Sequence, residues 1–165
     1  MCLPPWILAF GVALALTGPA RAADCTSTPA ELGAQLGTAW AAFASMDLAQ
    51  FAAARDAASS ALPCLTRTLT PQDAAAWHAV MALDAFAAED TTAAALSLRA
   101  ALDADPHFTL PPDLAPPGHP LRQAFDDAVA LPPSPRTAVA LPSGWLLFVD
   151  GTRTVTRPTR RPGLY

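Results

Sequence analysis

The chain has 165 residues and a formal net charge of −4, and all ten of its basic residues are arginines. Residues 23–131 contain 13 acidic residues and 4 arginines, a net charge of −9, whereas residues 132–165 contain 5 arginines and 1 acidic residue, a net charge of +4. The acidic main part argues against a nucleic acid as its partner. The lysine-free composition, rich in Ala and Pro, is typical of a bacterial gene of high GC content.

Residues 1–22 are interpreted as a signal peptide. Residues 6–17 form an uncharged apolar run that has the length of a signal-peptide core and is too short to span a bilayer. Pro19 ends the run, and the sequence Ala-Arg-Ala at residues 20–22 matches a cleavage site of small residues. We therefore expect an exported protein, periplasmic or extracellular, whose mature chain starts at Ala23 and has no transmembrane helix. Residues 1–5 contain no Lys or Arg, so an uncleaved apolar leader is the alternative.

Export changes the interpretation of the cysteines. Cys2 would leave with the signal peptide, and Cys25 and Cys64 would remain as a pair in an oxidising compartment. A disulfide between them would close a loop of about forty residues and stabilise the fold by roughly 4 kcal/mol in the chain-entropy model. Two free thiols are the alternative.

Five helices are expected between residues 28 and 131. Thr28–Glu31 and Thr70–Asp73 each read Thr-Pro-x-acid, which is a capping box with proline in the first turn. Each expected helix has apolar residues at helical spacing, and prolines or turn residues mark where it ends. The expected helices lie between Thr28 and Met46, Asp47 and Pro63, Thr70 and Glu89, Asp90 and Asp105, and His119 and Leu131.

The first four helices are predicted to form two related antiparallel hairpins. Residues 39–47 and 82–90 share five of nine residues at a spacing of 43. Residues 81–106 resemble a tetratricopeptide repeat, because the small, acidic, large apolar and proline positions of that family are filled by Ala82, Asp90, Ala94, Leu98, Ala101 and Pro106. His78 departs from the family, which has a Trp there. The resemblance implies a mainly α fold of two tetratricopeptide-like hairpins plus a capping helix, and it implies protein–protein binding.

The remainder is divided into a Pro-rich linker, residues 132–142, and a short β-hairpin segment, residues 143–165. An apolar run, Asp150-Gly151 and a Thr-rich run together predict the hairpin. The segment resembles a PEGA-type β-domain at Val149-Asp150-Gly151, Pro158 and Pro162-Gly163. It is too short to hold a core of its own. Either the chain is truncated within a longer β-domain, or the hairpin docks on the helical body.

The sequence predicts no catalytic residue, no metal site and no cofactor. His78, His107 and His119 lack the spacing of metal ligands and are interpreted as structural or surface residues. There is no Gly-rich phosphate loop. A Ser-His-Asp site assembled from distant parts of the chain is left open, but we expect a protein that is not an enzyme.

The basic tail supplies the candidate interaction residues Trp145, Arg153, Arg157, Arg160 and Arg161. They are suited to an anionic surface, such as lipid headgroups, a cell-wall polymer or an acidic protein. A solvated strand edge protected by charge is the alternative.

The sequence therefore predicts an exported, non-catalytic protein-interaction scaffold of the bacterial cell envelope. The alternative is a small exported enzyme or ligand-binding helical bundle, with a pocket near Trp40, Trp77 and His78.

Overall fold

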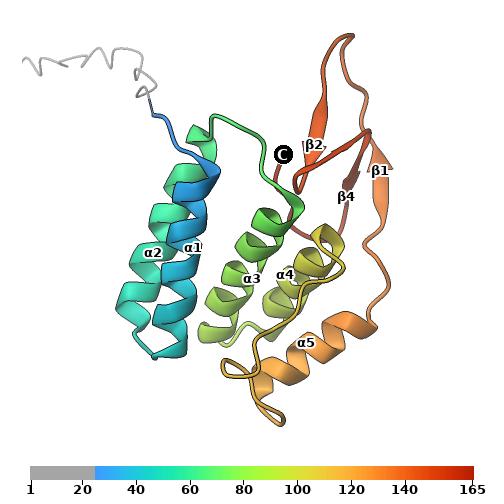
Figure 1. Ribbon diagram of the computed structural model, residues 1–165. Helices are drawn as coiled ribbons and strands as arrows, with labels where there is room; N and C mark the ends of the chain where they lie inside the picture. The colour runs from blue at the N-terminus through green and yellow to red at the C-terminus, as the bar shows by residue number, and fades with distance from the viewer. Residues whose placement is uncertain (1–24) are drawn as a thin grey trace, which may run out of the picture.

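The computed structural model describes residues 25–165, which form five α-helices followed by short antiparallel strands (Figure 1). The predicted signal peptide and its cleavage after Ala22 lie outside the described residues. No helix in the described part of the chain is long and apolar enough to cross a bilayer. The helices are α1 (Pro29–Ala44), α2 (Leu48–Ala61), η1 (Leu62–Cys64, a 3-10 turn), α3 (Pro71–Ala87), α4 (Thr91–Ala104) and α5 (Pro120–Ala130).

The mainly α class and the two helical hairpins are confirmed. α1 packs on α2, α3 packs on α4, and α5 lies against α4 (Figure 1). Both predicted capping boxes form: the Thr28 N–H donates to Glu31 over 2.7 Å, and the Thr70 N–H donates to Asp73 over 3.1 Å. Local hydrogen bonding at residues identified from sequence thus sets where α1 and α3 begin.

The turns of the two hairpins have the same backbone geometry. Met46 and Glu89 each precede the second helix of a hairpin, and their φ angles are 60° and 59°. The next residues, Asp47 and Asp90, cap α2 and α4 by accepting a backbone N–H at 2.9 Å. These positions are 43 residues apart, the spacing found in the sequence. The interpretation as a tetratricopeptide-like repeat stays a prediction.

The Cys25–Cys64 disulfide is present, with the two Cα atoms 5.2 Å apart. It joins the segment before α1 to the end of η1. The Ser27 N–H donates to the Cys64 carbonyl at 2.8 Å, and the Thr66 N–H donates to the Ser27 carbonyl at 2.9 Å. The start of the first hairpin therefore lies beside its end, as the pairing required.

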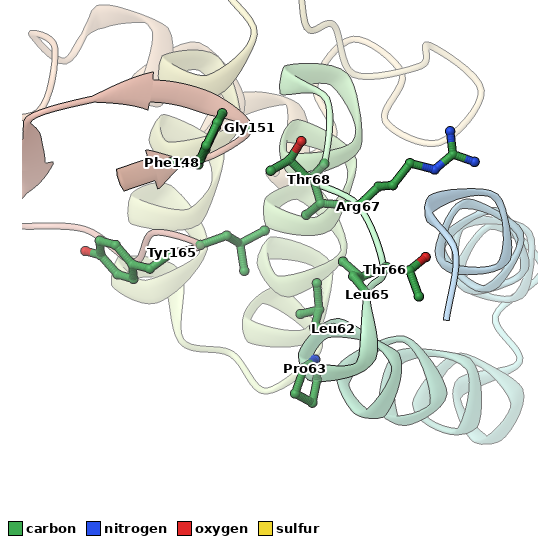
Figure 2. A pocket seen from close by; sticks show the side chains of 11 residues that line it. Leu62, Pro63, Leu65, Thr66, Arg67, Thr68, Phe148, Gly151 and Tyr165 are labelled. Carbon is green, nitrogen blue, oxygen red and sulfur yellow. The ribbon is translucent and has the colours of Figure 1, made fainter. Parts of the chain in front are cut away.

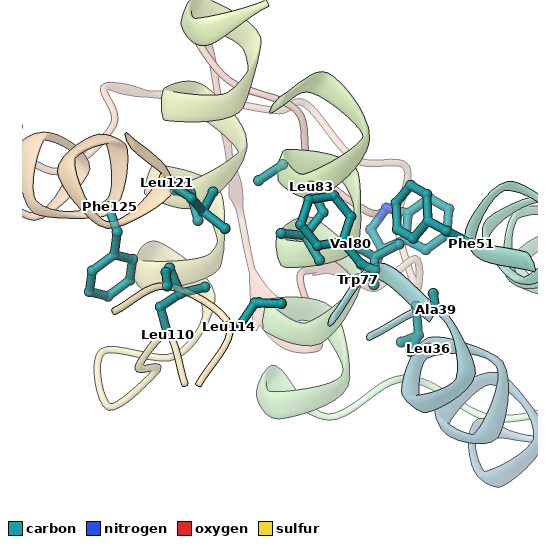
Figure 3. Close-up of a cluster of buried hydrophobic side chains, with 14 of the residues drawn as sticks. Leu36, Ala39, Phe51, Trp77, Val80, Leu83, Leu110, Leu114, Leu121 and Phe125 are labelled. Atoms are coloured by element: carbon teal, nitrogen blue, oxygen red, sulfur yellow. The ribbon is translucent and has the colours of Figure 1, made fainter. Parts of the chain in front are cut away.

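The core is centred on α3, which is buried on more than one side (Figure 3). Trp77, Val80 and Leu83 pack between the first hairpin and the elements on the other side of the molecule, where Leu110, Leu114, Leu121 and Phe125 lie. Many of the remaining buried positions of the four hairpin helices are alanines, which lets the helix backbones approach closely. Trp77 is a core residue, and Trp40 packs partly buried against the same cluster.

Residues 107–119 form a Pro-rich strap between α4 and α5. Leu110 and Leu114 are buried, and Arg122 of α5 donates to the Leu110 carbonyl at 2.7 Å and to the Ala115 carbonyl at 3.1 Å. Phe108 meets Phe125 edge to face at 6.0 Å. The strap is therefore held on the body by both apolar contacts and backbone hydrogen bonds.

The tail contains four three-residue strands. β2 (Leu147–Val149) pairs with β3 (Thr152–Thr154), which confirms the hairpin at Asp150-Gly151. β1 (Arg136–Ala138) pairs with β4 (Thr156–Pro158), a pairing that the sequence did not predict. Describing residues 132–142 only as a linker was therefore wrong. The prolines stand at the ends of this segment, and the residues between them keep the backbone N–H groups that an edge strand needs.

Candidate functional site

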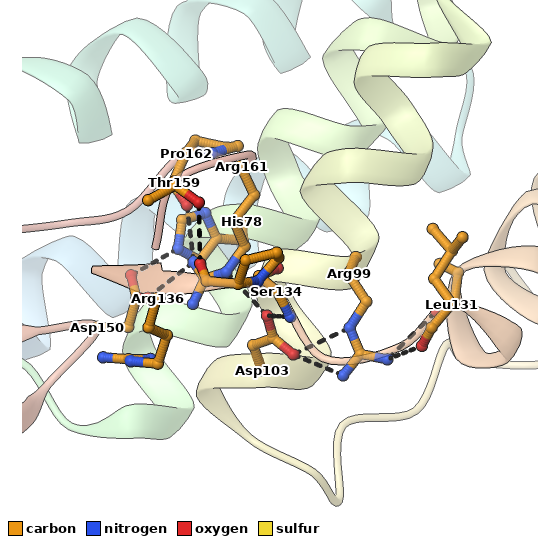
Figure 4. A network of polar contacts seen from close by, with 12 residues as sticks. His78, Arg99, Asp103, Leu131, Ser134, Arg136, Asp150, Thr159, Arg161 and Pro162 are labelled. Atoms are coloured by element: carbon orange, nitrogen blue, oxygen red, sulfur yellow. Dashed lines mark hydrogen bonds and ion pairs between the residues drawn. The ribbon is translucent and has the colours of Figure 1, made fainter. Parts of the chain in front are cut away.

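The tail docks on the second helical hairpin through a buried polar network (Figure 4). At its centre is Asp150, in the tight turn between β2 and β3. One carboxylate oxygen lies 2.8 Å from His78 Nε2 of α3 and also accepts the Leu164 N–H at 2.9 Å. The other oxygen accepts from Arg161 Nη1 at 2.9 Å. Three hydrogen-bonding partners therefore satisfy one buried carboxylate.

The network continues into α4. Arg161 Nε donates to Asp103 at 2.9 Å, and Arg99 donates to the same carboxylate through Nε at 2.9 Å and Nη2 at 2.7 Å. Arg99 also donates to the Leu131 carbonyl at 3.1 Å, after the end of α5. Two arginines and two aspartates thus link α4, the end of α5 and the tail. Buried charges are tolerated in proteins when they are paired in this way.

The network keeps both aspartates ionised. Burial raises the pKa of the Asp150 carboxyl, but the hydrogen bonds from His78 and Leu164 and the charge of Arg161 outweigh burial, so the net pKa lies below its ordinary value. Burial also raises the pKa of Asp103, and hydrogen bonds from Ser134 and Arg99 more than offset it. Both carboxylates therefore act as hydrogen-bond acceptors at neutral pH.

His78 is buried and works as a structural residue. Because Asp150 is ionised and accepts, the His78 nitrogen that faces it, Nε2, carries the hydrogen. His78 Nδ1 is buried and has no hydrogen-bond partner within residues 25–165. Within residues 25–165 no hydrogen bond joins a serine to His78 or Asp150, and the pair ties a turn of the tail to a helix.

A glycine lets the same turn approach the start of α3. Gly151 has a φ of 78°, and a Cβ placed on it would lie 2.6 Å from the Thr70 carbonyl carbon and 2.7 Å from the Leu69 oxygen. Only glycine fits without a shift of the backbone at this contact. The Asp-Gly pair was predicted for its turn geometry, but it also fixes the distance between tail and helix.

The candidate interaction residues of the tail fall into two groups. Trp145, Arg153, Arg157 and Arg160 are exposed. Arg161 is not, because its side chain is 1% exposed and is enclosed by Asp103 and Asp150. The prediction that Arg161 belongs to an exposed basic cluster was therefore wrong. Nothing in the local sequence distinguishes Arg161 from Arg160, since both carboxylates that bind Arg161 come from other elements, α4 and the β2–β3 turn.

An apolar groove crosses the tips of both helical hairpins, with a volume of about 480 Å³. Its apolar wall consists of Phe43, Ala44, Met46, Leu48, Phe86, Ala87 and Leu114. Met46 and Leu48 are 75% and 49% exposed, an unusual exposure for large apolar side chains that adjoin one another. Glu89 and Asp113 stand at the rim, and no ion pair among residues 25–165 involves either of them.

A second pocket, of about 600 Å³, lies between the α2–α3 connection and the tail (Figure 2). Its apolar lining includes Leu62, Leu65, Phe148 and Tyr165. A third, shallower depression lies between α4 and α5. None of these three pockets is lined by Trp40, Trp77 or His78. Within residues 25–165, no three His, Cys, Asp or Glu side chains are grouped so that they could hold a metal ion.

Comparison of the chain with models of protein families, with curated proteins and with solved structures gave no match. Sequence reasoning identified Trp145 and the exposed arginines, but it missed the groove and the Asp150 network. Two local signals were present in the sequence. One is an apolar residue, Met46, at the expected turn of the first hairpin, and the other is a histidine, His78, on the helix expected between Thr70 and Glu89.

Proposed function

We propose that this protein is an exported, non-catalytic protein-interaction scaffold of the bacterial cell envelope. In this proposal the helical body binds a protein partner, and the basic tail contacts an anionic surface of the envelope. The signal-peptide pattern of residues 1–22 supports export, and the tetratricopeptide-like residues support protein binding. The disulfide fits an oxidising compartment.

The observation that carries the proposal is the groove at the hairpin tips. Its base is formed by core residues, such as Phe43 and Leu114, while Met46 and Leu48 extend into solvent at its edge. Methionine adapts its shape to different partners, and it is enriched at protein interfaces. A rigid base with adaptable apolar edges is a suitable receptor for one or two large side chains of a partner.

The charges of the groove indicate the chemistry of the partner. Glu89 and Asp113 flank the apolar wall, and the body as a whole is acidic. A segment that presents apolar anchors with Lys or Arg beside them would place each group against its complement. We therefore propose a basic, amphipathic protein segment as the occupant of the groove.

Substituting Leu48→Asp tests this proposal. Leu48 is half-exposed and begins α2, where an acidic residue favours the helix N-terminus, so folding should be preserved. In affinity capture from an envelope extract, we expect this variant to retain much less of the partner protein than the unsubstituted chain does. Val129→Asp is the matched control, because Val129 is 53% exposed on α5 and lies outside the groove. Equal capture by both variants would reject the groove as the binding site.

The alternative is a small exported enzyme or ligand-binding bundle with a pocket near Trp40, Trp77 and His78. The three described pockets are lined by other residues, and His78 is engaged with Asp150. No observation favours that reading over a scaffold.

A further inference from the structure

The segment between β1 and β2, residues 139–146, projects from the molecule as a narrow loop at the top of Figure 1. The Trp145 N–H donates to the Pro142 carbonyl at 3.1 Å and closes a tight turn in which Gly144 has a φ of 83°. Trp145 is 69% exposed and Leu146 is 56% exposed. A well-defined turn therefore presents two large apolar side chains to solvent.

Cationic residues flank this loop on the neighbouring strands. Arg153, Val155 and Arg157 alternate along the run from β3 to β4, and all three are exposed. Val155 is a bend between β3 and β4, and on either side of it the Thr154 and Thr156 hydroxyls meet at 3.2 Å. Arg153 lies opposite Phe148 of β2, and Arg157 lies opposite Thr137 of β1, so both arginines are on strands next to the two ends of the loop. Val155 is joined to the base of the loop, because its carbonyl accepts the Val139 N–H at 2.9 Å. No ion pair within residues 25–165 involves either arginine.

We propose that this end of the tail attaches the protein to an anionic phospholipid surface. Trp145 and Leu146 would enter the interfacial layer, where tryptophan is favoured, while Arg153 and Arg157 would contact lipid phosphates. The inference rests on the proposed envelope contact of the tail, and it names lipid as the surface.

Shape and polarity favour lipid over the other anionic surfaces. A soluble anionic polymer would neutralise the arginines but would leave Trp145 and Leu146 in water. A protein partner needs an area of about 800 Å² on each side, which a single narrow loop does not offer. A bilayer interface accepts isolated apolar side chains next to cations without a complementary surface.

The charge distribution and the fold would orient the protein on such a membrane. The acidic helical body would be repelled by anionic lipid, and the cationic tail would be attracted. The buried Asp150 network holds the tail on the body, so the loop points in a fixed direction. Figure 1 shows the hairpin tips at the opposite end of the molecule from this loop. The groove would therefore face away from the membrane and stay open to a partner.

Vesicle flotation tests the inference directly. The chain from Ala23 to Tyr165, which contains the whole described core and the disulfide, would be mixed with vesicles of phosphatidylcholine, with or without phosphatidylglycerol. We expect binding only to the phosphatidylglycerol vesicles, weakened between about 0.05 M and 0.5 M salt. The double variant Trp145→Ser with Leu146→Ser should bind about tenfold more weakly. The double variant Arg153→Gln with Arg157→Gln should lose about fivefold for each arginine.

Matched controls separate these contacts from general effects. Val129→Ser removes an equally exposed apolar side chain from α5, and Arg67→Gln removes an exposed arginine from the α2–α3 connection. Both should bind like the unsubstituted chain. Vesicle binding that does not depend on Trp145 and Leu146 would overturn the inference.

A soluble polyanion, dextran sulfate, distinguishes the two levels of the proposal. Binding to dextran sulfate without binding to vesicles would overturn the lipid surface and leave the anionic envelope contact standing. Binding to neither would overturn both. The Leu48→Asp experiment is unaffected by either result, because Leu48 lies in the groove at the other end of the molecule.

Discussion

The helical body and the β tail are held in the folded state by different interactions. The body buries large apolar side chains from all five helices and the strap, whereas Val149 is the only large aliphatic residue of the four short tail strands that is fully buried. The tail relies instead on Asp150 and Arg161, both buried and both paired with residues of the body. A segment too small for its own core can therefore be ordered by a few charged hydrogen bonds.

The body and the tail should therefore respond differently to a single substitution. Apolar packing in the body is spread over many residues, so the neighbouring side chains can partly compensate for one small substitution. A buried ionic network is concentrated, and removing one member leaves the others buried without partners. Deleting residues 145–165 would have this effect, because His78 would lose Asp150 and Asp103 would lose Arg161. Single substitutions are therefore better probes of the tail than truncation.

The largest effect is expected from the disulfide, which acts on the body. The double variant Cys25→Ser with Cys64→Ser should lower the free energy of unfolding by about 4 kcal/mol, because the unfolded chain regains the freedom of a loop of about forty residues. Urea unfolding measures this loss. As a control, reductant should lower the free energy of unfolding of the unsubstituted chain by a similar amount and leave that of the double variant unchanged. A double variant as stable as the unsubstituted chain would contradict the structure.

Asp150→Asn should have the next largest effect, and it acts on the tail. The amide keeps the size of the carboxylate but loses its charge and turns an N–H donor toward either His78 or Arg161. We expect a loss of about 3 kcal/mol in the free energy of unfolding. Asp126→Asn, on the exposed face of α5, is the control and should change it by less than about 0.5 kcal/mol. Similar results for the two variants would show that the network does not hold the tail.

Gly151→Ala should lower the free energy of unfolding by about 2 kcal/mol, from left-handed backbone strain and from the contact with Leu69 and Thr70. Gly144→Ala is the matched control, because Gly144 has a similar φ of 83° but no atom within 4 Å of the added Cβ. It should cost about 1 kcal/mol. The difference between the two variants, measured by urea unfolding, isolates the tail–helix contact; equal losses would mean that the contact is not made.

The smallest effect is a dependence of stability on acid pH. The pKa values of Asp150 and Asp103 are lowered in the folded state, so the stability that they contribute is fully present above their unfolded pKa of about 3.9. It is lost as the pH falls through the lower, folded pKa values. The gap in stability between the unsubstituted chain and Asp150→Asn should therefore be constant near neutral pH and shrink below about pH 4. A gap that does not change with pH would contradict the lowered pKa of Asp150.

Local sequence patterns were sufficient to predict most of the helical body. Thr28 and Thr70 begin helices through interactions with residues three positions away, and Asp150-Gly151 forms a turn by itself, so each signal lies within a few residues. The pairing of Cys25 with Cys64 was predicted because export would leave them as a pair in an oxidising compartment. The helix starts and the turn were confirmed because short-range chemistry determines them. The disulfide, which spans 39 residues, was also confirmed.

The docking of the tail could not be predicted in the same way. His78 and Asp150 are 72 residues apart, and Arg161 reaches Asp103 over 58 residues. No periodicity or spacing links such positions, and the identity of a buried arginine among four exposed ones depends on tertiary packing. The groove is also a tertiary feature, because its wall combines the tips of two hairpins with Leu114 of the strap.

Hydrogen–deuterium exchange of the unsubstituted chain tests most directly whether the tail belongs to the folded body. The Asp150 N–H donates to the Leu164 carbonyl, and the Leu164 N–H donates to the Asp150 carboxylate, both at 2.9 Å. We predict that these two amides exchange on the same slow timescale as the amides of α3, since they open only when the network does. Rapid exchange of Asp150 and Leu164 beside a protected α3 would show a tail that moves independently, and it would contradict the account.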